Sequence, residues 1–166
     1  PTLKIIVPTL PHYAEHMAQE AKNWGVADVL VVTGDEDKYD SFKAARCALA
    51  ASGTVALELG LAATPAVIAY KIHPLTAALY RRFVKTPFAS LVNIMAGGLG
   101  GAQEIPGNST QKNLQSAVET LLTSDQACAE QISVLNQVRS WLTVGNGNSP
   151  SREAAQTVLK VAKQTI

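Results

Sequence analysis

The sequence predicts an α/β fold in which a parallel β-sheet is flanked by helices. Short apolar runs rich in Val and Ile recur along the chain, and helix-compatible segments separate them. This alternation favours parallel strands joined by right-handed helical crossovers. The chain has 166 residues, of which 47% are hydrophobic and 16% charged. It is therefore long enough for one domain with a substantial core, and its composition excludes intrinsic disorder.

Three runs are predicted strands, at residues 3–7, 29–32 and 66–70, because they are apolar, β-rich and bounded by Pro or Gly. The run at residues 48–51 is too short to assign by itself. Residues 89–94 are predicted to be extended. The glycine-rich segment at residues 97–108 is predicted to be a loop.

Helices are predicted where apolar residues recur about every 3.6 positions. Gly25 ends the first of them, Asp40 or Ser41 caps the second, and Pro74 suits the first turn of the fourth. The predicted helical ranges are 12–24, from 40 or 41 to 47, 55–61, 74–85, 111–122, 126–142 and 151–163.

The charge and the cysteine content limit the binding partners and the cellular setting that the sequence predicts. The net charge of +1 provides no global attraction for nucleic acid, and no basic stripe is interleaved with aromatic residues, so no nucleic-acid partner is expected. Cys47 and Cys128 form no CxxC motif, which favours a reducing, cytosolic setting. No run of about 20 apolar residues occurs, so no membrane span is expected.

The segment Ser52-Gly53-Thr54, followed by Glu58, is the strongest candidate site. Glycine allows an anion to approach the backbone, the start of the next helix offers unpaired N–H groups, and two hydroxyls add donors. Glu58 lies one helical turn beyond Thr54 on the same side, where a carboxylate can accept hydrogen bonds from a ribose diol. This spacing indicates a nucleotide-diphosphate site. The alternative is a Ser or Thr helix cap with a surface glutamate.

A second candidate is the basic segment from Lys71 to Lys85, in which no acidic residue occurs. An amphipathic basic helix can lie on an anionic membrane surface or hold phosphate groups. The alternative is a solvated basic face on a helix that packs on the core. The basic residues of this segment are Lys71, His73, Arg81, Arg82 and Lys85.

Two further motifs carry less weight. Residues 12–16 read HYAEH and fit the H-x-x-E-H zinc pattern, but a catalytic zinc needs a third protein ligand, so solvent-facing helix residues are favoured and no metal is expected. Residues 97–101 read GGLGG but lack the last glycine of G-x-G-x-x-G, because Gln103 occupies that position.

Five strings, taken in order, resemble the carboxyl-terminal half of lipid-A-disaccharide synthase. They are ASGTVALE at residues 51–58, PAVIAYK at 65–71, PLT at 74–76, RFVKT at 82–86 and SLVNIMAG at 90–97. The resemblance implies the carboxyl-terminal half of a GT-B glycosyltransferase fold, a Rossmann-like parallel sheet with flanking helices. It implies an inverting transfer of diacylglucosamine from UDP to a diacylglucosamine 1-phosphate, in lipid A biosynthesis.

The resemblance also assigns roles. Ser52, Gly53 and Thr54 would bind the diphosphate, Glu58 the ribose and Asn93 the donor sugar. Further charge for phosphates or the lipid surface would come from Lys71, Arg82 and Lys85. No cofactor is implied. The expected partners are a UDP-diacylglucosamine donor, a lipid acceptor, the anionic cytoplasmic face of the inner membrane, to which the enzyme would be peripheral, and a second copy in a homodimer.

The chain departs from the family at several points. Val92 replaces a proline, Gly98 and Leu99 replace an Arg-Glu pair, and Glu104 matches a later glutamate only with a one-residue insertion. Residue 1 is proline and residues 3–7 already form a strand, so we expect a part of a longer protein. Residues 1–145 would form the nucleotide-sugar domain without its first strand, and residues 146–166 a helix that packs on an amino-terminal domain.

The general base of the transfer is expected in that amino-terminal half, so the chain alone should bind UDP weakly and not turn over. Two other functions stay open. One is a UDP-sugar epimerase-like domain, which also uses a Ser-Gly turn and a Glu. The other is a non-catalytic module that binds nucleotide or membrane.

Overall fold

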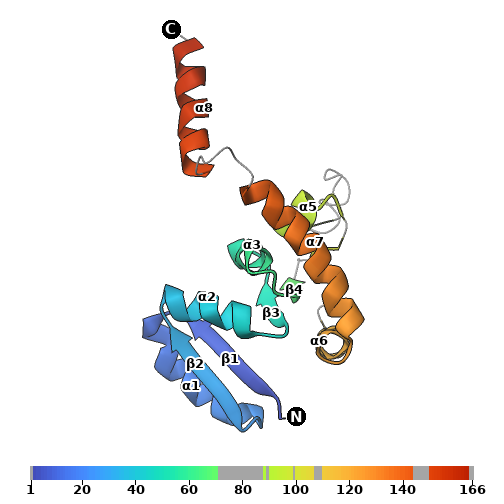
Figure 1. Cartoon of the computed structure of the whole chain (residues 1–166). Helices are drawn as coiled ribbons and strands as arrows, with labels where there is room; N and C mark the ends of the chain where they lie inside the picture. The colour runs from blue at the N-terminus through green and yellow to red at the C-terminus, as the bar shows by residue number, and fades with distance from the viewer. Residues whose placement is uncertain are drawn as a thin grey trace, which may run out of the picture.

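The computed structural model describes residues 2–70, 88, 90–98, 100–106, 110–143 and 150–164. Strands and helices alternate along its first two thirds, and helices follow (Figure 1). The strands are β1 (Lys4–Thr9), β2 (Asp28–Thr33), β3 (Ala48–Ala51), β4 (Ala66–Tyr70) and β5 (Gln103–Pro106). The α-helices are α1 (Ala14–Ala21), α2 (Asp35–Ala44), α3 (Thr54–Leu61), α5 (Leu91–Met95), α6 (Gln111–Thr123), α7 (Asp125–Thr143) and α8 (Pro150–Gln164).

The described strands form two separate parallel sheets. One has the order β1–β2, with Ile6 in register with Leu30, and the other has the order β3–β4–β5, with Ala50 in register with Ile68. Every pairing is parallel, which confirms the predicted α/β class. The run at residues 48–51, unassigned from sequence, is a strand because the neighbouring β4 supplies its ladder.

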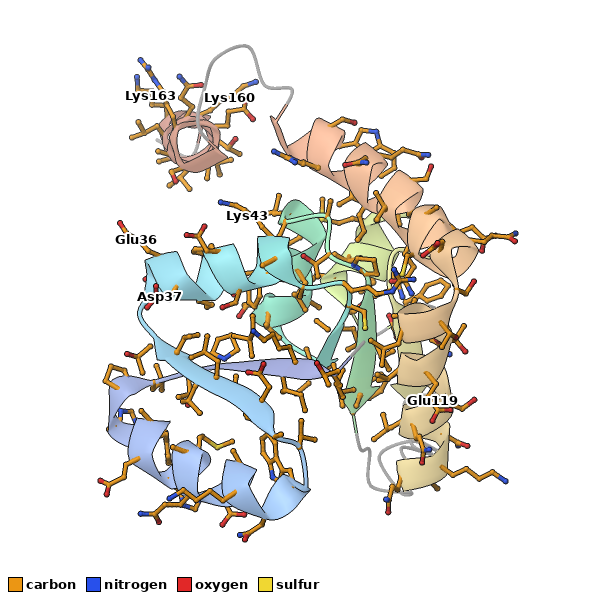
Figure 2. The ribbon with its side chains drawn as sticks, turned by 60° about the horizontal axis from the view of Figure 1, so that its bottom comes forward. Glu36, Asp37, Lys43, Glu119, Lys160 and Lys163 are labelled. Carbon is orange, nitrogen blue, oxygen red and sulfur yellow. The ribbon has the colours of Figure 1, made fainter. Side chains whose placement is uncertain are left out.

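Helices cover both sheets. In the first sheet, α1 packs on one face and α2 on the other (Figures 1 and 2). In the second sheet, Ile68 lies in a buried cluster with side chains of α3, α5 and α7, whereas the neighbouring Val67 packs against α6. The central strand β4 is thus buried on both faces, as a continuous apolar run predicts.

Two predictions on the segment after residue 88 were wrong. Residues 89–94 were expected to be extended, but α5 begins at Leu91 because the Ser90 hydroxyl caps it by accepting the Asn93 N–H at 3.3 Å. The glycine-rich segment at 97–108 was expected to be a loop throughout, but it contains β5. This strand forms because the edge of β4 offers a parallel ladder, with Tyr70 in register with Pro106.

The helix expected from residue 40 or 41 to 47 begins earlier, at Asp35, and ends at Ala44. It begins there because Gly34, with φ +100, makes the turn out of β2 and three acidic residues occupy its first turn. The helix expected at residues 12–24 is confirmed in outline, with 3-10 turns at Pro11–Tyr13 and Lys22–Trp24. Gly25, with φ +70, ends it as predicted.

The predicted helix at residues 74–85 lies outside the described residues. The helices predicted near the carboxyl terminus are confirmed as α6, α7 and α8. Figures 1 and 2 show α8 standing apart from the other helices, with Lys160 and Lys163 on its surface.

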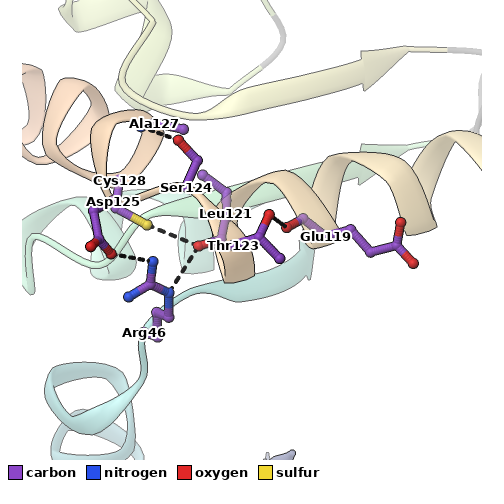
Figure 3. A network of polar contacts seen from close by, with 8 residues as sticks. All are labelled: Arg46, Glu119, Leu121, Thr123, Ser124, Asp125, Ala127 and Cys128. Carbon is purple, nitrogen blue, oxygen red and sulfur yellow. Dashed lines mark hydrogen bonds and ion pairs between the residues drawn. The ribbon is translucent and has the colours of Figure 1, made fainter.

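Arg46, just before β3, links the start of this strand to the corner between α6 and α7 (Figure 3). Its Nε donates to the Leu121 carbonyl at 3.1 Å, and its Nη2 lies 2.6 Å from the Asp125 carboxylate. The Cys128 thiol donates to the same Leu121 carbonyl at 3.1 Å. The last turn of α6 is thereby joined to residues more than seventy positions earlier in the chain.

Candidate functional site

The carboxyl ends of the parallel strands are where ligands bind in open α/β sheets, because the helix starts and loops gather there. At the ends of β1 and β2 lies a hollow of about 400 Å³. Thr9 and Thr33, the last residues of the two strands, are in register, so both strands end at the same edge. The hollow is lined by Pro8, Thr9, Leu10, Pro11, Gly34, Asp35 and Lys38.

The Ser52-Gly53-Thr54 turn follows β3 directly and leads into α3. All three residues are exposed. The Ser52 N–H donates to the Ala69 carbonyl at 3.2 Å, so the sheet uses this amide. The Gly53 and Thr54 amides donate to no acceptor in the described part of the chain. Within the part of the chain that the structure describes, two of the three amides are thus without an acceptor at the start of a two-turn helix.

The alternative of a Ser or Thr helix cap does not hold for α3. Its N-cap residue is Gly53, and no side chain makes a capping hydrogen bond there. The Ser52 and Thr54 hydroxyls are consequently not used as caps, and the orphan donors at this helix start have no side-chain acceptor from the cap position.

Glu58 lies on α3 one turn after Thr54, as the spacing predicts. Its carboxylate is partly buried, with 29% of the side chain exposed, and Oε1 lies 3.4 Å from both Lys38 Nζ and the Tyr39 hydroxyl of α2. The side chain is therefore turned toward α2, and through Lys38 it reaches the rim of the hollow.

Lys38 stands between two carboxylates. Its ammonium lies 3.2 Å from Asp35 and 3.4 Å from Glu58, and the hydrogen bond that it donates to Asp35 is the main cause that raises the pKa of Lys38 above its ordinary value. Sequence reasoning did not identify this lysine. The available signal was the acidic helix start after the second strand, Asp35-Glu36-Asp37, of which Figure 2 labels the last two.

Asn93 lies on a different element, α5, and is 2% exposed. Its amide nitrogen donates to the Ala102 carbonyl and to Glu104 Oε1, both at 2.8 Å, and its oxygen accepts the Ala102 N–H at 2.9 Å. Glu104 Oε1 also accepts from the Ser90 N–H at 3.0 Å and the Ser90 hydroxyl at 2.7 Å. Asn93 is thus built into a buried hydrogen-bond network that joins α5 to β5.

The remaining predicted site residues, Lys71, Arg82 and Lys85, lie outside the described residues. Over the ranges that the structure describes, no three His, Cys, Asp or Glu side chains are grouped so that they could hold a metal ion. The helices of the same ranges include none with the length and apolarity needed to cross a membrane.

Comparisons with known proteins agree on one family. The family model described as lipid-A-disaccharide synthetase matches residues 1–158. The chain is 45% identical over 166 residues to the lipid-A-disaccharide synthase of Rhodospirillum centenum, covering 100% of this chain and 41% of that protein. It is 39% identical to the synthase of Paramagnetospirillum magneticum and 31% identical to that of Gluconobacter oxydans, in each case over 166 residues. The chain spans about two fifths of the length of these relatives.

Proposed function

This chain belongs to the lipid-A-disaccharide synthase family, and on this premise we propose that it is the carboxyl-terminal, UDP-sugar-binding half of a GT-B glycosyltransferase in lipid A biosynthesis. The observation that carries the proposal is the exposed Ser52–Thr54 turn at the carboxyl end of β3. Two amides there donate to no acceptor among the described residues, and Glu58 follows one turn later.

The amides of Gly53 and Thr54 and the two hydroxyls of the turn bind the UDP diphosphate. A helix start favours an anion because its N–H groups are unpaired and the helix dipole is positive there. Ser52 contributes its hydroxyl, since its amide is held by Ala69. The Glu58 carboxylate accepts hydrogen bonds from the ribose diol in place of Tyr39, while the Lys38 ammonium, 3.4 Å from Glu58 Oε1, offsets negative charge beside the phosphates.

In the complete enzyme this chain contributes binding and charge stabilisation. An inverting transfer of diacylglucosamine needs a general base on the acceptor hydroxyl, and that base belongs to the amino-terminal half. The turn of residues 52–54 stabilises the negative charge that develops on the departing UDP. The 166 residues alone are then expected to bind UDP weakly and to transfer no sugar.

Asn93 is the proposed contact for the donor sugar. The hydrogen bonds that its side chain already makes limit which of its atoms can contact a sugar hydroxyl. Both amide hydrogens are used by Ala102 and Glu104, and the side-chain oxygen accepts one N–H. A sugar hydroxyl can therefore donate only to the remaining lone pair of Oδ1. Glu104, which accepts from the Asn93 side-chain nitrogen, and Ser90, whose hydroxyl accepts the Asn93 backbone N–H, position this side chain.

The proposed cellular place is the cytoplasmic face of the inner membrane. The basic residues Lys71, Arg82 and Lys85 would supply charge to anionic lipid or to substrate phosphates. Cosedimentation with vesicles containing phosphatidylglycerol is expected to pellet the protein at low salt and to release it at high salt. Pelleting that is absent at low salt would remove the membrane contact from the proposal.

Residues 1–145 are the proposed nucleotide-sugar domain, and α8 is proposed to pack on the amino-terminal domain of the longer protein. Three apolar side chains of α8, Val158, Leu159 and Val161, are each more than half exposed, which supports a partner surface for this helix. The full-length enzyme is expected to form a homodimer, and sedimentation velocity would measure its mass in solution.

UDP titration with a matched pair of variants tests the nucleotide site. Glu58→Ala is expected to weaken UDP binding about tenfold by removing the ribose acceptor, which corresponds to about 1.4 kcal/mol. Glu119→Ala removes an exposed glutamate of α6 far along the chain (Figure 2) and is expected to leave UDP binding unchanged. UDP binding that is equally strong in both variants would contradict the ribose role of Glu58.

A further inference from the structure

We propose that Lys38 is a positioning residue for the nucleotide, and the proposal rests on the ribose role proposed above for Glu58. The Lys38 ammonium holds one oxygen of the Glu58 carboxylate, so that this carboxylate meets the ribose diol in a single orientation. Lys38 thereby favours nucleotides that carry both ribose hydroxyls over nucleotides that lack them. This role in specificity is separate from the charge that Lys38 provides beside the phosphates.

The two oxygens of the Glu58 carboxylate differ in their contacts. Oε1 lies 3.4 Å from Lys38 Nζ and 3.4 Å from the Tyr39 hydroxyl. Oε2 accepts no hydrogen bond from any residue that the structure describes. Because a carboxylate has about four lone-pair sites, acceptor sites stay open on Oε2 while both donors remain on Oε1.

The two donors to Oε1 are not equivalent. The Lys38 contact is partly buried, whereas the Tyr39 contact is exposed. Lys38 also carries a full positive charge, so its contact with the carboxylate is an ion pair, which the contact of a phenol is not. A ribose hydroxyl is therefore expected to replace Tyr39 and to leave Lys38 in place. One hydroxyl of the diol then donates to Oε1 and the other to Oε2.

Lys38 is itself held by its neighbours before any nucleotide binds. Its ammonium lies 3.2 Å from Asp35, one helical turn earlier, and 4.5 Å from the centre of the Tyr39 ring. The exposed fraction of the Lys38 side chain is 26%. Much of the conformational entropy that a lysine loses when it forms an ion pair is thus lost already on folding. The orientation of Glu58 is consequently set in advance, and preorganisation of this kind reduces the cost of binding.

The ion pair between Lys38 and Glu58 joins α2 to α3 across twenty positions of sequence. Lys38 also lies on the wall of the hollow at the carboxyl ends of β1 and β2, whereas α3 begins directly after the turn at residues 52–54. Among the residues that the structure describes, no other cation pairs with Glu58. No neighbouring lysine or arginine of these ranges is therefore in place to substitute for Lys38 in a variant.

NMR titration of the chain with UDP and with 2′,3′-dideoxyuridine 5′-diphosphate, which lacks both hydroxyls, tests the proposal. The unsubstituted chain is expected to prefer UDP about tenfold, and Lys38→Met to reduce this preference to about threefold or less. Lys38→Arg keeps the charge and the donors and is expected to keep most of the preference. Lys43→Met removes an exposed lysine of the same helix (Figure 2) and is expected to leave the preference unchanged.

The Glu58→Ala background separates positioning from a direct contact between Lys38 and phosphate. If Lys38 acts through Glu58, Lys38→Met weakens UDP binding less, by about threefold or more, when residue 58 is already alanine. An equal effect of Lys38→Met in both backgrounds would overturn the proposal, and so would an undiminished preference for UDP in Lys38→Met. Lys38→Gln, which also lacks the charge, provides the same comparison if Lys38→Met unfolds.

Failure of the proposed function has a different signature. A chain that binds both nucleotides equally, or whose preference for UDP survives Glu58→Ala, would contradict the ribose role of Glu58 and the role of Lys38 with it. A preference that Glu58→Ala abolishes and Lys38→Met retains would overturn the role of Lys38 alone.

Discussion

Glu104 accepts a hydrogen bond from the buried Asn93 amide at 2.8 Å, across eleven positions of sequence. The same carboxylate oxygen accepts both donors of Ser90, so one side chain of β5 fixes the start of α5. A carboxylate that accepts several short hydrogen bonds is strongly held, since charge-assisted bonds are about twice as strong as neutral ones. This arrangement sets the geometry around the proposed donor-sugar contact.

Asn93→Ala is expected to lower the free energy of unfolding by about 2–3 kcal/mol, because it leaves the Ala102 backbone groups buried without partners. Urea denaturation measures the change. Asn136→Ala, at an exposed position of α7, is the matched control and is expected to change stability by less than about 0.5 kcal/mol. Equal effects of the two substitutions would show that the network contributes little.

Gly98 has a backbone conformation that favours glycine. Its φ is +88, and a Cβ there would lie 2.7 Å from the Phe88 ring. Gly100 has a similar φ of +85 but open space around it. Gly98→Ala is therefore expected to destabilise the protein by about 1 kcal/mol more than Gly100→Ala, since both share the backbone cost and only one meets the ring. Thermal unfolding of the pair checks this, and equal losses would contradict it.

Arg46 is expected to stabilise the fold mainly through the hydrogen bond that it donates to the Leu121 carbonyl. The Asp125 side chain is 93% exposed, and exposed ion pairs contribute about 0–1 kcal/mol. Asp125→Asn should therefore cost less than about 0.5 kcal/mol at low salt and nothing measurable in 1 M NaCl. Arg46→Ala, which also removes the hydrogen bond to the carbonyl, should lower stability more than Asp125→Asn does at either salt concentration. A large loss from Asp125→Asn would reverse this ranking.

Burial raises the pKa of the Cys47 thiol above its ordinary value, and the neighbouring Cys128 adds to the effect. In a Cys128→Ala background, which leaves the burial in place, alkylation of Cys47 by iodoacetamide is expected to reach half its maximal rate at a higher pH than a free thiol. As pH rises, the Cys47 thiol ionises in the unfolded chain before it ionises in the folded protein. The free energy of unfolding is therefore expected to fall as pH rises from the ordinary pKa of the thiol toward its raised value in the folded protein. A rate profile centred below that of a free thiol would contradict the burial effect.

The sequence predicted the elements that are apolar and well bounded. The strand at residues 66–70 lies where expected because Pro65 marks its start. The turn at residues 52–54 lies where expected because Gly53 interrupts the regular structure between β3 and α3. The start of α2 was missed because polar residues 35–39 carry no apolar periodicity. α5 and β5 were missed because each depends on partners elsewhere: Ser90 caps the helix, and the edge of β4 pairs with the strand.

The site was predicted less completely than the fold. The Thr54–Glu58 spacing follows from helix geometry and could be read directly. The pairing of Glu58 with Lys38 could not, because twenty residues and one strand separate them. The role of Glu104 needed the register of β5, which no local pattern reveals.

Amide chemical shifts of the ¹⁵N-labelled chain during titration with UDP, and separately with uridine, test the central claim most directly. We predict that UDP shifts the Gly53 and Thr54 amides and that uridine, which lacks the diphosphate, does not. Shifts of these two amides that are the same with uridine, or no shift at UDP concentrations that move other resonances, would contradict a diphosphate site at this turn.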